Sequence, residues 1–356
     1  MTSQRFDSID VFRGLTVAAM LLVNNAGDWS YVYPWLEHAS WHGCTPADFI
    51  FPFFLVIVGV SLDFAYFPKM MEGTSSSSLI AAAWRRAFRI FILGIVLHVI
   101  AMYFIPDRQF RLMGVLQRIG ICFGMAATLV VLLRSTVRIV VVAGMILIFY
   151  CALMSVSGGY EPHHNLADRL DTWVLGSLAY QFDPLSLRAQ EPEGLLSTIP
   201  SIASVMLGVF AARLLRSRNW RGLVLAAIIL AVLGFVWQMV MPWNKQLWTS
   251  SFVCWTSAWA FLFIAIFYGL IDYWKLPPVG VSFGRNAVLA YALAWIASCV
   301  LALTNAMSHF YPTWFAEGIG AYTSLEFASF AFAACFTGLI GLLMLVLRMC
   351  KVFVRL

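Results

Sequence analysis

Apolar residues in this chain gather into ten long runs, and most charged residues fall between them. The runs cover residues 11–26, 47–66, 84–104, 113–133, 139–156, 195–215, 223–241, 247–271, 281–303 and 325–347. A helix that crosses a bilayer needs roughly 20 mainly apolar residues, and the runs are close to this length. The pattern therefore predicts an all-α integral membrane protein, a polytopic bundle of about ten transmembrane helices in one domain that covers residues 1–356.

Composition supports the same class. Hydrophobic residues make up 62% of the chain and charged residues 11%, and the mean hydropathy is +0.84. A soluble domain has roughly 45–50% apolar and about 25% charged residues, so a soluble globular protein is excluded. Asp7, Asp10 and Arg13 occupy the positions where the apolar part of a signal peptide would begin, and we expect no cleaved leader.

The positive charges are distributed unevenly along the chain. If both termini are cytoplasmic, 17 of the 23 Lys and Arg residues lie on the cytoplasmic side and 6 on the other. Short cytoplasmic loops are enriched in these residues, so the pattern predicts cytoplasmic termini. The net charge of +6 then reflects topology in a lipid bilayer and does not indicate nucleic-acid binding. The seven cysteines show no CxxC spacing, which gives no sign of a thiolate metal site, and no metal is expected.

A first polar cluster stands directly before the second apolar run, in "PWLEHASWHGCTPADFIFPFF" at residues 34–54. Asn24 ends the first run, Asp48 begins the second, and His38 lies in the loop that joins them. An imidazole beside a carboxylate is the usual arrangement of a general base, and an Asn amide can donate to an oxyanion. His38, Asn24 and Asp48 are therefore candidate catalytic residues.

Simpler interpretations of this cluster remain open. Thr45, Pro46 and Asp48 are typical of a helix start, so Asp48 could serve only as a cap. His42 could hydrogen-bond within the loop. His38 and His42 are four residues apart and could share a metal, but the pattern lacks a third ligand. Trp41 could stack on a sugar ring, although aromatic residues also collect at membrane interfaces for general reasons.

Two further clusters lie within or beside the apolar runs. Gln117 and Arg118 fall inside the fourth run, where an ionisable group either serves function or forms an ion pair between helices. Asp10 and Arg13 are spaced to pair on a helix at the predicted cytoplasmic mouth. The other residues expected at that level are Arg85, Arg86, Arg89, Arg285 and Asn286. Together they could bind an anionic ligand, although positive-inside flanking explains Arg85 and Arg86.

The remaining polar signals concern a core histidine and the loops. His98 is predicted to be a satisfied core histidine of the third run. Two long outer loops, 27–46 and 158–194, suggest a site on the outer face. Within the second, "NLADRLDTWVLG" has helical spacing of apolar residues and predicts a short amphipathic helix at the interface. A third outer loop is expected at residues 305–324.

Several long segments, taken in order, resemble the heparan-α-glucosaminide N-acetyltransferase family, a branch of the transmembrane acyltransferases with many bacterial members. They are "SIDVFRGLTVAAMLLVNNAG", "HASWHGCTPADFIFPFFLVIVG", "GVLQRIG", "DRLDTWVLG", "EPEGLLSTIPSI", "NKQLWTSSFV" and "RNAVLAY". The chain departs from the family pattern in extra residues between Asn24 and His38, in "EPEG" for "DPEG", and in lacking the large luminal domain of the lysosomal members. The acceptor could therefore be a free sugar or a cell-wall fragment.

The resemblance implies an acetyl transfer across the membrane. Acetyl-CoA would bind as co-substrate from the cytoplasmic side, and an amino sugar of the glucosamine type would accept the acetyl group on the other face. His38 matches the family's catalytic histidine, and Asn24 matches an active-site asparagine. The resemblance also implies a multi-pass protein of a bacterial inner membrane. We group the other matching or nearby residues as substrate-binding candidates (Arg118, Gln117, Glu193, Trp41, Asn244) and cofactor-binding candidates (Arg13, Arg89, Arg285, Asn286).

The resulting hypothesis has His38 as the base, Asn24 as the oxyanion donor and Asp48 as the group that orients His38. A covalent acetyl-imidazole intermediate is an open variant. Two other functions fit the same pattern: an amino-sugar or oligosaccharide permease, and an O-acetyltransferase of an envelope glycan. The exact acceptor and the oligomeric state, including a homodimer, are left open by the sequence.

Overall fold

The computed structural model describes residues 6–354, which are almost entirely helical. The long helices are α1 (Asp7–Val23), α2 (Ile50–Met71), α3 (Ser76–Phe104), α4 (Val115–Leu133), α5 (Thr136–Val156), α7 (Thr198–Arg216), α8 (Trp220–Trp237), α9 (Ser250–Phe267), α11 (Ala287–Leu303) and α13 (Leu325–Met349). The short α-helices are α6 (Leu166–Val174), α10 (Val281–Arg285) and α12 (Ala306–Tyr311). Short 3-10 or π-helical segments are η1 (Pro46–Phe49), η2 (Gly176–Leu178), η3 (Tyr268–Tyr273), η4 (Pro312–Ile319) and η5 (Gly320–Tyr322).

Each of the ten predicted segments forms a helix. Among residues 6–354, eight helical segments are long and apolar enough to cross a membrane, so the protein is a multi-pass membrane protein. The two other segments differ from simple spans. Helix α1 has only 17 residues, and α11 forms a bent pair with residues 306–322 at an angle of 81°.

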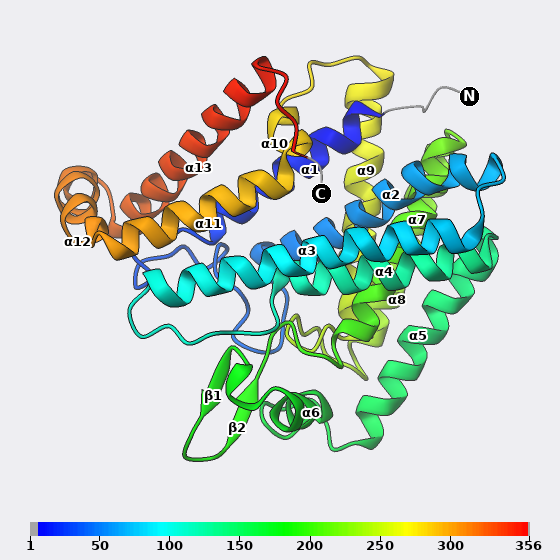
Figure 1. The fold of residues 1–356 in the computed structure, drawn as a ribbon, viewed down its shortest axis with the longest axis horizontal. Coiled ribbons are helices and arrows are strands. Elements are labelled where there is room, and N and C mark those ends of the chain that lie inside the picture. Colours follow the sequence, from blue (N-terminus) through cyan, green and yellow to red (C-terminus); the bar gives the residue numbers. More distant parts are fainter. Residues whose placement is uncertain (1–5, 355–356) are drawn as a thin grey trace.

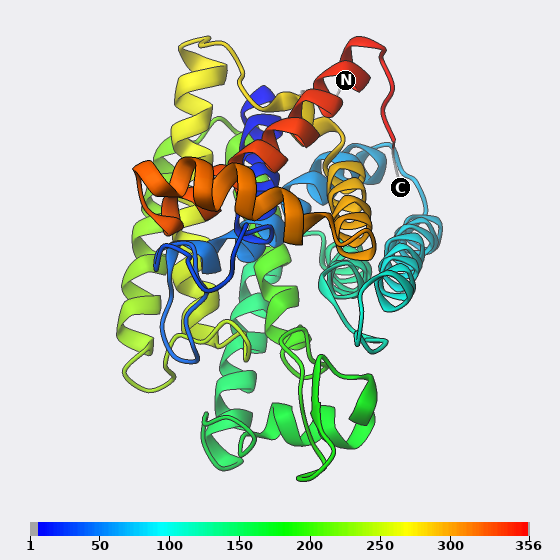
Figure 2. The same cartoon turned by 90° about the vertical axis from the view of Figure 1, so that its left-hand side faces the viewer.

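The bundle has two ends that differ in their loops and charged residues. Figures 1 and 2 show α6 and the β-strands on the opposite side of the molecule from the two chain ends. We call the side with α6 and the loop 24–45 the loop end, since Trp41 of that loop donates to the carbonyl of Tyr160 beside α6 at 2.8 Å. We call the side with Arg13 and Arg285 the basic end. Residues 353 and 354 line a cavity with Arg13 of α1, so both ends of the described part of the chain lie near the basic end.

The loop end is more ordered than the sequence indicated. The amphipathic helix predicted in "NLADRLDTWVLG" is confirmed as α6, which Asn165 caps by accepting from the N–H of Asp168 at 2.8 Å. An antiparallel hairpin of β1 (Gln181–Asp183) and β2 (Arg188–Gln190) was not predicted.

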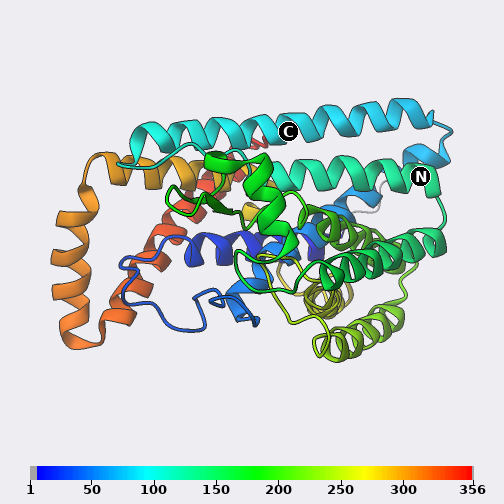
Figure 3. The ribbon, with the colours of Figure 1, turned by 90° about the horizontal axis from the view of Figure 1, so that it is seen from below.

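Residues 305–324, expected to be a loop, instead form α12, η4 and η5, which turn away from α11 at the edge of the molecule (Figure 3).

Close packing of α2 on α7 depends on two glycines. A Cβ added at Gly59 would lie 1.9 Å from the carbonyl oxygen of Val205, and one at Gly208 would lie 2.0 Å from that of Val56. Both obstacles are backbone atoms, so neither can move aside as a side chain would. Small residues at such crossings let helix backbones approach closely, as is typical of membrane bundles. This crossing holds α2, and with it the preceding η1 segment that contains Asp48, against the centre of the bundle.

Replacing Gly208 by Ala should therefore destabilise the protein by about 1–3 kcal/mol, the usual cost of overpacking. Gly338→Ala in α13 is the matched control, because a Cβ there meets nothing within 4 Å; it should be neutral or slightly stabilising. Thermal unfolding of the detergent-solubilised proteins measures both. Equal unfolding temperatures for the two variants would contradict the tight crossing.

Candidate active site

Asp48 connects the start of the second span to His38. Thr45 caps the segment: its backbone N–H and hydroxyl donate to Oδ2 of Asp48 at 3.0 and 3.1 Å, and the N–H of Ala39 donates to the same oxygen at 3.1 Å. The other oxygen, Oδ1, lies 2.8 Å from Nδ1 of His38. The capping role and the orienting role that the sequence left as alternatives are thus both present, one on each carboxylate oxygen.

The loop that carries His38 is fastened at several points. The N–H of Gly43 donates to the carbonyl of Trp243 at 2.8 Å, and the indole of Trp41 donates to the carbonyl of Tyr160. Gly43 has a φ of +122°, a backbone conformation that favours glycine. These contacts tie the loop to two other segments of the loop end, so the ring of His38 occupies a fixed place.

Lys245 is a site residue that the sequence reasoning missed. Its Nζ lies 3.0 Å from both ring nitrogens of His38 and 3.6 Å from Oδ1 of Asp48. Burial lowers the pKa of the Lys245 ammonium, and the carboxylates of Asp48 and Glu193 oppose this shift. The sequence held one signal for Lys245. It lies beside Asn244 in "NKQLW", on the predicted outer side, where few Lys and Arg residues are expected.

Three cavities follow one another through the bundle. An outer cavity of about 470 Å³ and a central cavity of about 140 Å³ share six lining residues: Asn24, His38, Val115, Glu193, Lys245 and Tyr291. The central cavity and a cavity of about 500 Å³ at the basic end share another five: Phe54, Leu116, Ile119, Ala287 and Val288. The first shared set, which we call the neck, is polar, and the second is apolar. His38 and Asn24 therefore lie between the two larger spaces.

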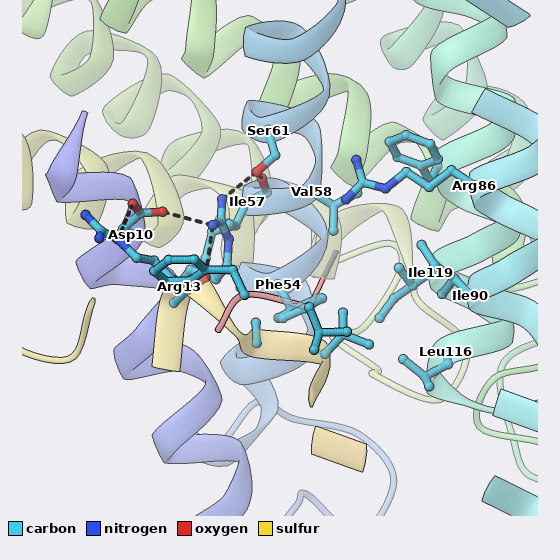
Figure 4. A pocket seen from close by; sticks show the side chains of 17 residues that line it. Asp10, Arg13, Phe54, Ile57, Val58, Ser61, Arg86, Ile90, Leu116 and Ile119 are labelled. Atoms are coloured by element: carbon cyan, nitrogen blue, oxygen red, sulfur yellow. Dashed lines mark hydrogen bonds and ion pairs between the residues drawn. The ribbon is translucent and has the colours of Figure 1, made fainter. Parts of the chain in front are cut away.

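The basic-end cavity brings three guanidinium groups to one space. Figure 4 shows Arg13 and Arg86 on opposite sides of it, and Arg285 also lines it. Arg13 donates to Asp10 at 3.0 Å and to the hydroxyl of Ser61 at 2.7 Å. Arg86 lies over the ring of Phe123, 5.0 Å from its centroid. This is the end where an anionic group would find cations.

Two of the predicted cofactor-binding residues are placed differently. Arg89 is exposed and is not among the residues that line the cavity, whereas Arg86, which we attributed to charge flanking, does line it. Asn286 binds the C-terminal segment: its amide donates to the carbonyl of Val352 and accepts from the N–H of Val354, both at 3.1 Å. It shapes the cavity through that segment, since Val354 is one of the lining residues.

Glu193 and Trp41, two of the predicted substrate-binding residues, line the outer cavity. Arg111 donates to the carboxylates of both Glu193 and Glu191 and lies over the ring of Tyr180, 4.6 Å from its centroid. Burial would raise the pKa of Glu193, but the cations of Arg111, Arg118 and Lys245 outweigh it and lower that pKa. The outer cavity therefore has an ionised carboxylate at its neck.

Arg118, Gln117 and Asn244 hold the structure around the site and do not line its cavities. Arg118 is fully buried and donates to the hydroxyl of Ser197 and the carbonyl of Gly194, which fastens α4 to the start of α7. Asn244 accepts from the N–H of Leu247 at 2.8 Å and so shapes the loop that carries Lys245.

The remaining histidines are separate from the site. Nδ1 of His98 lies 2.7 Å from the carbonyl oxygen of Arg111 and 3.4 Å from Nε2 of Gln117, so it is the satisfied core histidine that we predicted. His42 faces Glu161, with Nε2 3.4 Å from Oε1, while His38 faces Asp48. The two histidines thus have different partners, and within residues 6–354 no group of three His, Cys, Asp or Glu side chains is arranged to hold a metal.

Comparison with known proteins assigns this chain to a family. Residues 5–228 match the family described as "Heparan-alpha-glucosaminide N-acetyltransferase, catalytic". The chain is similar to the human protein named heparan-alpha-glucosaminide N-acetyltransferase, with 27% identity over 350 residues, and to its mouse counterpart, with 26% over 353. These alignments cover 81% and 82% of this chain but 52% and 53% of the relatives. The chain spans about half the length of the curated relatives it matches.

Asp171 makes the packing of the loop end sensitive to pH. Burial raises its pKa from 3.8 to about 7, although it accepts a hydrogen bond from the N–H of Leu195 at 2.9 Å. Between these two values the folded protein holds a proton that the unfolded chain has lost, so stability should fall as the pH rises from about 4 to about 7. The shift sets an upper limit of roughly 4 kcal/mol on this effect.

Asp171→Asn should remove this part of the pH dependence and keep an acceptor for Leu195. Unfolding temperatures measured between pH 4 and pH 8 test it, with Asp183→Asn on the exposed hairpin as the control. The same slope in all three proteins would contradict the assignment to Asp171.

Proposed function

Because this chain belongs to the heparan-α-glucosaminide N-acetyltransferase catalytic family, we propose that it is a membrane-embedded N-acetyltransferase. It takes the acetyl group of acetyl-CoA at the basic end and passes it to the amine of a glucosamine-type sugar at the loop end. The basic end faces the cytoplasm of a bacterial cell, in keeping with the positive-inside distribution of charge. Residues 1–356 act as one acyltransferase domain.

The series of three cavities is the observation that carries this proposal. Phosphates are costly to place in an apolar environment, and the basic-end cavity offers them Arg13, Arg86 and Arg285. The central cavity is small and mainly apolar, so it suits a long thin chain and excludes a charged nucleotide. A thioester on such an arm could reach His38 while the nucleotide stays at the basic end.

The outer cavity has the features expected for a sugar. Trp29, Trp41 and Tyr180 line it, and aromatic faces in a pocket offer apolar contact area to the C–H faces of a pyranose. The carboxylate of Glu193 at the neck can attract the amine of an amino sugar and hold it near His38. The same cavity could accept a hydroxyl as nucleophile, so the nature of the acceptor atom has to be measured.

Asp48 and Asn24 complete the chemistry around His38. A proton on Nδ1 directed at Asp48 leaves Nε2 with a lone pair, which is the tautomer a general base requires. His38 removes a proton from the amine as the amine attacks the thioester carbonyl, and the amide of Asn24 donates to the oxyanion that forms. If the acetyl group instead passes first to the imidazole, an acetylated His38 accumulates when the acceptor is left out.

His38→Ala should reduce acetyl transfer by roughly 10²–10⁴-fold, the usual contribution of a general base, with donor binding nearly unchanged. Purified protein in liposomes, supplied with acetyl-CoA and glucosamine, measures the N-acetylglucosamine formed. A permease would move the sugar and form no product, and an O-acetyltransferase would prefer a hydroxyl acceptor offered beside the amine. Wild-type activity in His38→Ala would remove the assignment of the base.

Arg86→Ala should weaken acetyl-CoA binding by about 10- to 150-fold, since it removes a charge-assisted contact worth about 1.5–3 kcal/mol. Arg89→Ala is the matched control, one turn along the same helix, because Arg89 does not line the cavity. Titration of acetyl-CoA by calorimetry measures both. Equal losses would mean that general surface charge, and not this cavity, holds the donor.

A further inference from the structure

Lys245 is the feature of the neck that the mechanism above does not use. Six described residues line both the central and the outer cavity, namely Asn24, His38, Val115, Glu193, Lys245 and Tyr291. Among these six residues, Lys245 is the one whose side chain ordinarily carries a positive charge, and the carboxylates of Asp48 and Glu193 favour its charged form. The donor and acceptor spaces meet at the neck, and negative charge would develop there during acyl transfer. Lys245 therefore places a cation beside that charge.

Asp48 has other partners besides Lys245. Its Oδ2 receives hydrogen bonds from the backbone N–H groups of Thr45 and Ala39, and its Oδ1 lies 2.8 Å from His38. The distance from Nζ of Lys245 to that Oδ1 is 3.6 Å, which is longer than a good hydrogen bond. Lys245 and Asp48 therefore form an ion pair, but at this distance the pair leaves the N–H groups of the ammonium available to a ligand.

The ammonium group retains donors for a ligand. It carries three N–H groups, and a His38 that donates from Nδ1 to Asp48 can accept only one of them, at Nε2. That N–H has to turn toward the ligand when Nε2 acts as the base. The loop around Lys245 is held by Asn244, whose Oδ1 accepts from Leu247, and by the bond from Gly43 to Trp243. The cation is thus fixed beside the base before any ligand arrives, and such preorganisation is what makes an oxyanion donor effective.

We infer that Lys245 is a further catalytic residue, whose ammonium stabilises the oxyanion of the tetrahedral intermediate together with the amide of Asn24. This inference rests on the proposed function. The amine nitrogen forms a bond to the thioester carbon, the carbonyl π electrons move to oxygen beside Lys245, and Nε2 of His38 takes the amine proton. When the carbonyl re-forms, the carbon–sulfur bond breaks, and the imidazolium returns that proton to the departing thiolate.

Lys245→Met tests the inference, since it keeps the length of the side chain and removes the charge. We expect kcat to fall by roughly 10²–10³-fold, the usual loss for one oxyanion donor, while the KM for each substrate, acetyl-CoA binding and the unfolding temperature change little. Lys245→Arg should recover part of kcat because it restores the cation. Lys275→Met, at an exposed position in the basic-end loop 274–280, controls for loss of a lysine and should behave as wild type.

The outcomes separate this inference from the function on which it rests. Wild-type protein that forms no acetylated sugar overturns the proposed function itself. An active wild type whose Lys245→Met variant keeps its kcat, or loses only binding or stability, overturns the role of Lys245 and leaves the function standing. If Lys245→Met does not assemble, Lys245→Gln provides the same comparison of kcat against KM.

Discussion

The carboxylate of Asp48 is the interaction on which the rest of the site depends. One oxygen receives the N–H groups and the hydroxyl that start the second span, and the other holds Nδ1 of His38. The fold of the loop and the orientation of the ring therefore share one residue at the membrane edge. The backbone donors on one oxygen and the neighbouring His38 and Lys245 at the other stabilise the carboxylate, which is why an ionisable group can stand at the start of an apolar helix.

Around this centre the polar groups divide into two kinds. Some face the cavities, and these are the cations of the basic end and the groups of the neck. Others, such as Arg118 and Asn286, are buried and hold segments together through backbone contacts. The central cavity between the two ends is mainly apolar, so a phosphate group is costly to place there. The proposed chemistry uses this separation of a charged entrance from the reaction point at the neck.

The sequence was sufficient for what depends on local pattern. Apolar runs located the helices, the spacing in "NLADRLDTWVLG" located α6, and the loop that joins Asn24 to Asp48 indicated that His38 lies near both. It was insufficient for what depends on tertiary packing. Lys245 is 207 positions from His38, and nothing in a single sequence pairs them. Arg86 and Arg89 are arginines in the same basic stretch, and the sequence does not distinguish them. Successive residues of a helix are about 100° apart, so the way α3 packs decides which of the two faces the cavity.

The central claim is that acetyl groups pass from one side of the membrane to the other at His38. Liposomes with the protein in one known orientation, labelled acetyl-CoA at the basic end only and an impermeant amino sugar at the loop end only, test it directly. The account predicts labelled N-acetyl sugar at the loop end and unlabelled, deacylated CoA left at the basic end. Product that forms only when donor and sugar share one compartment would contradict it.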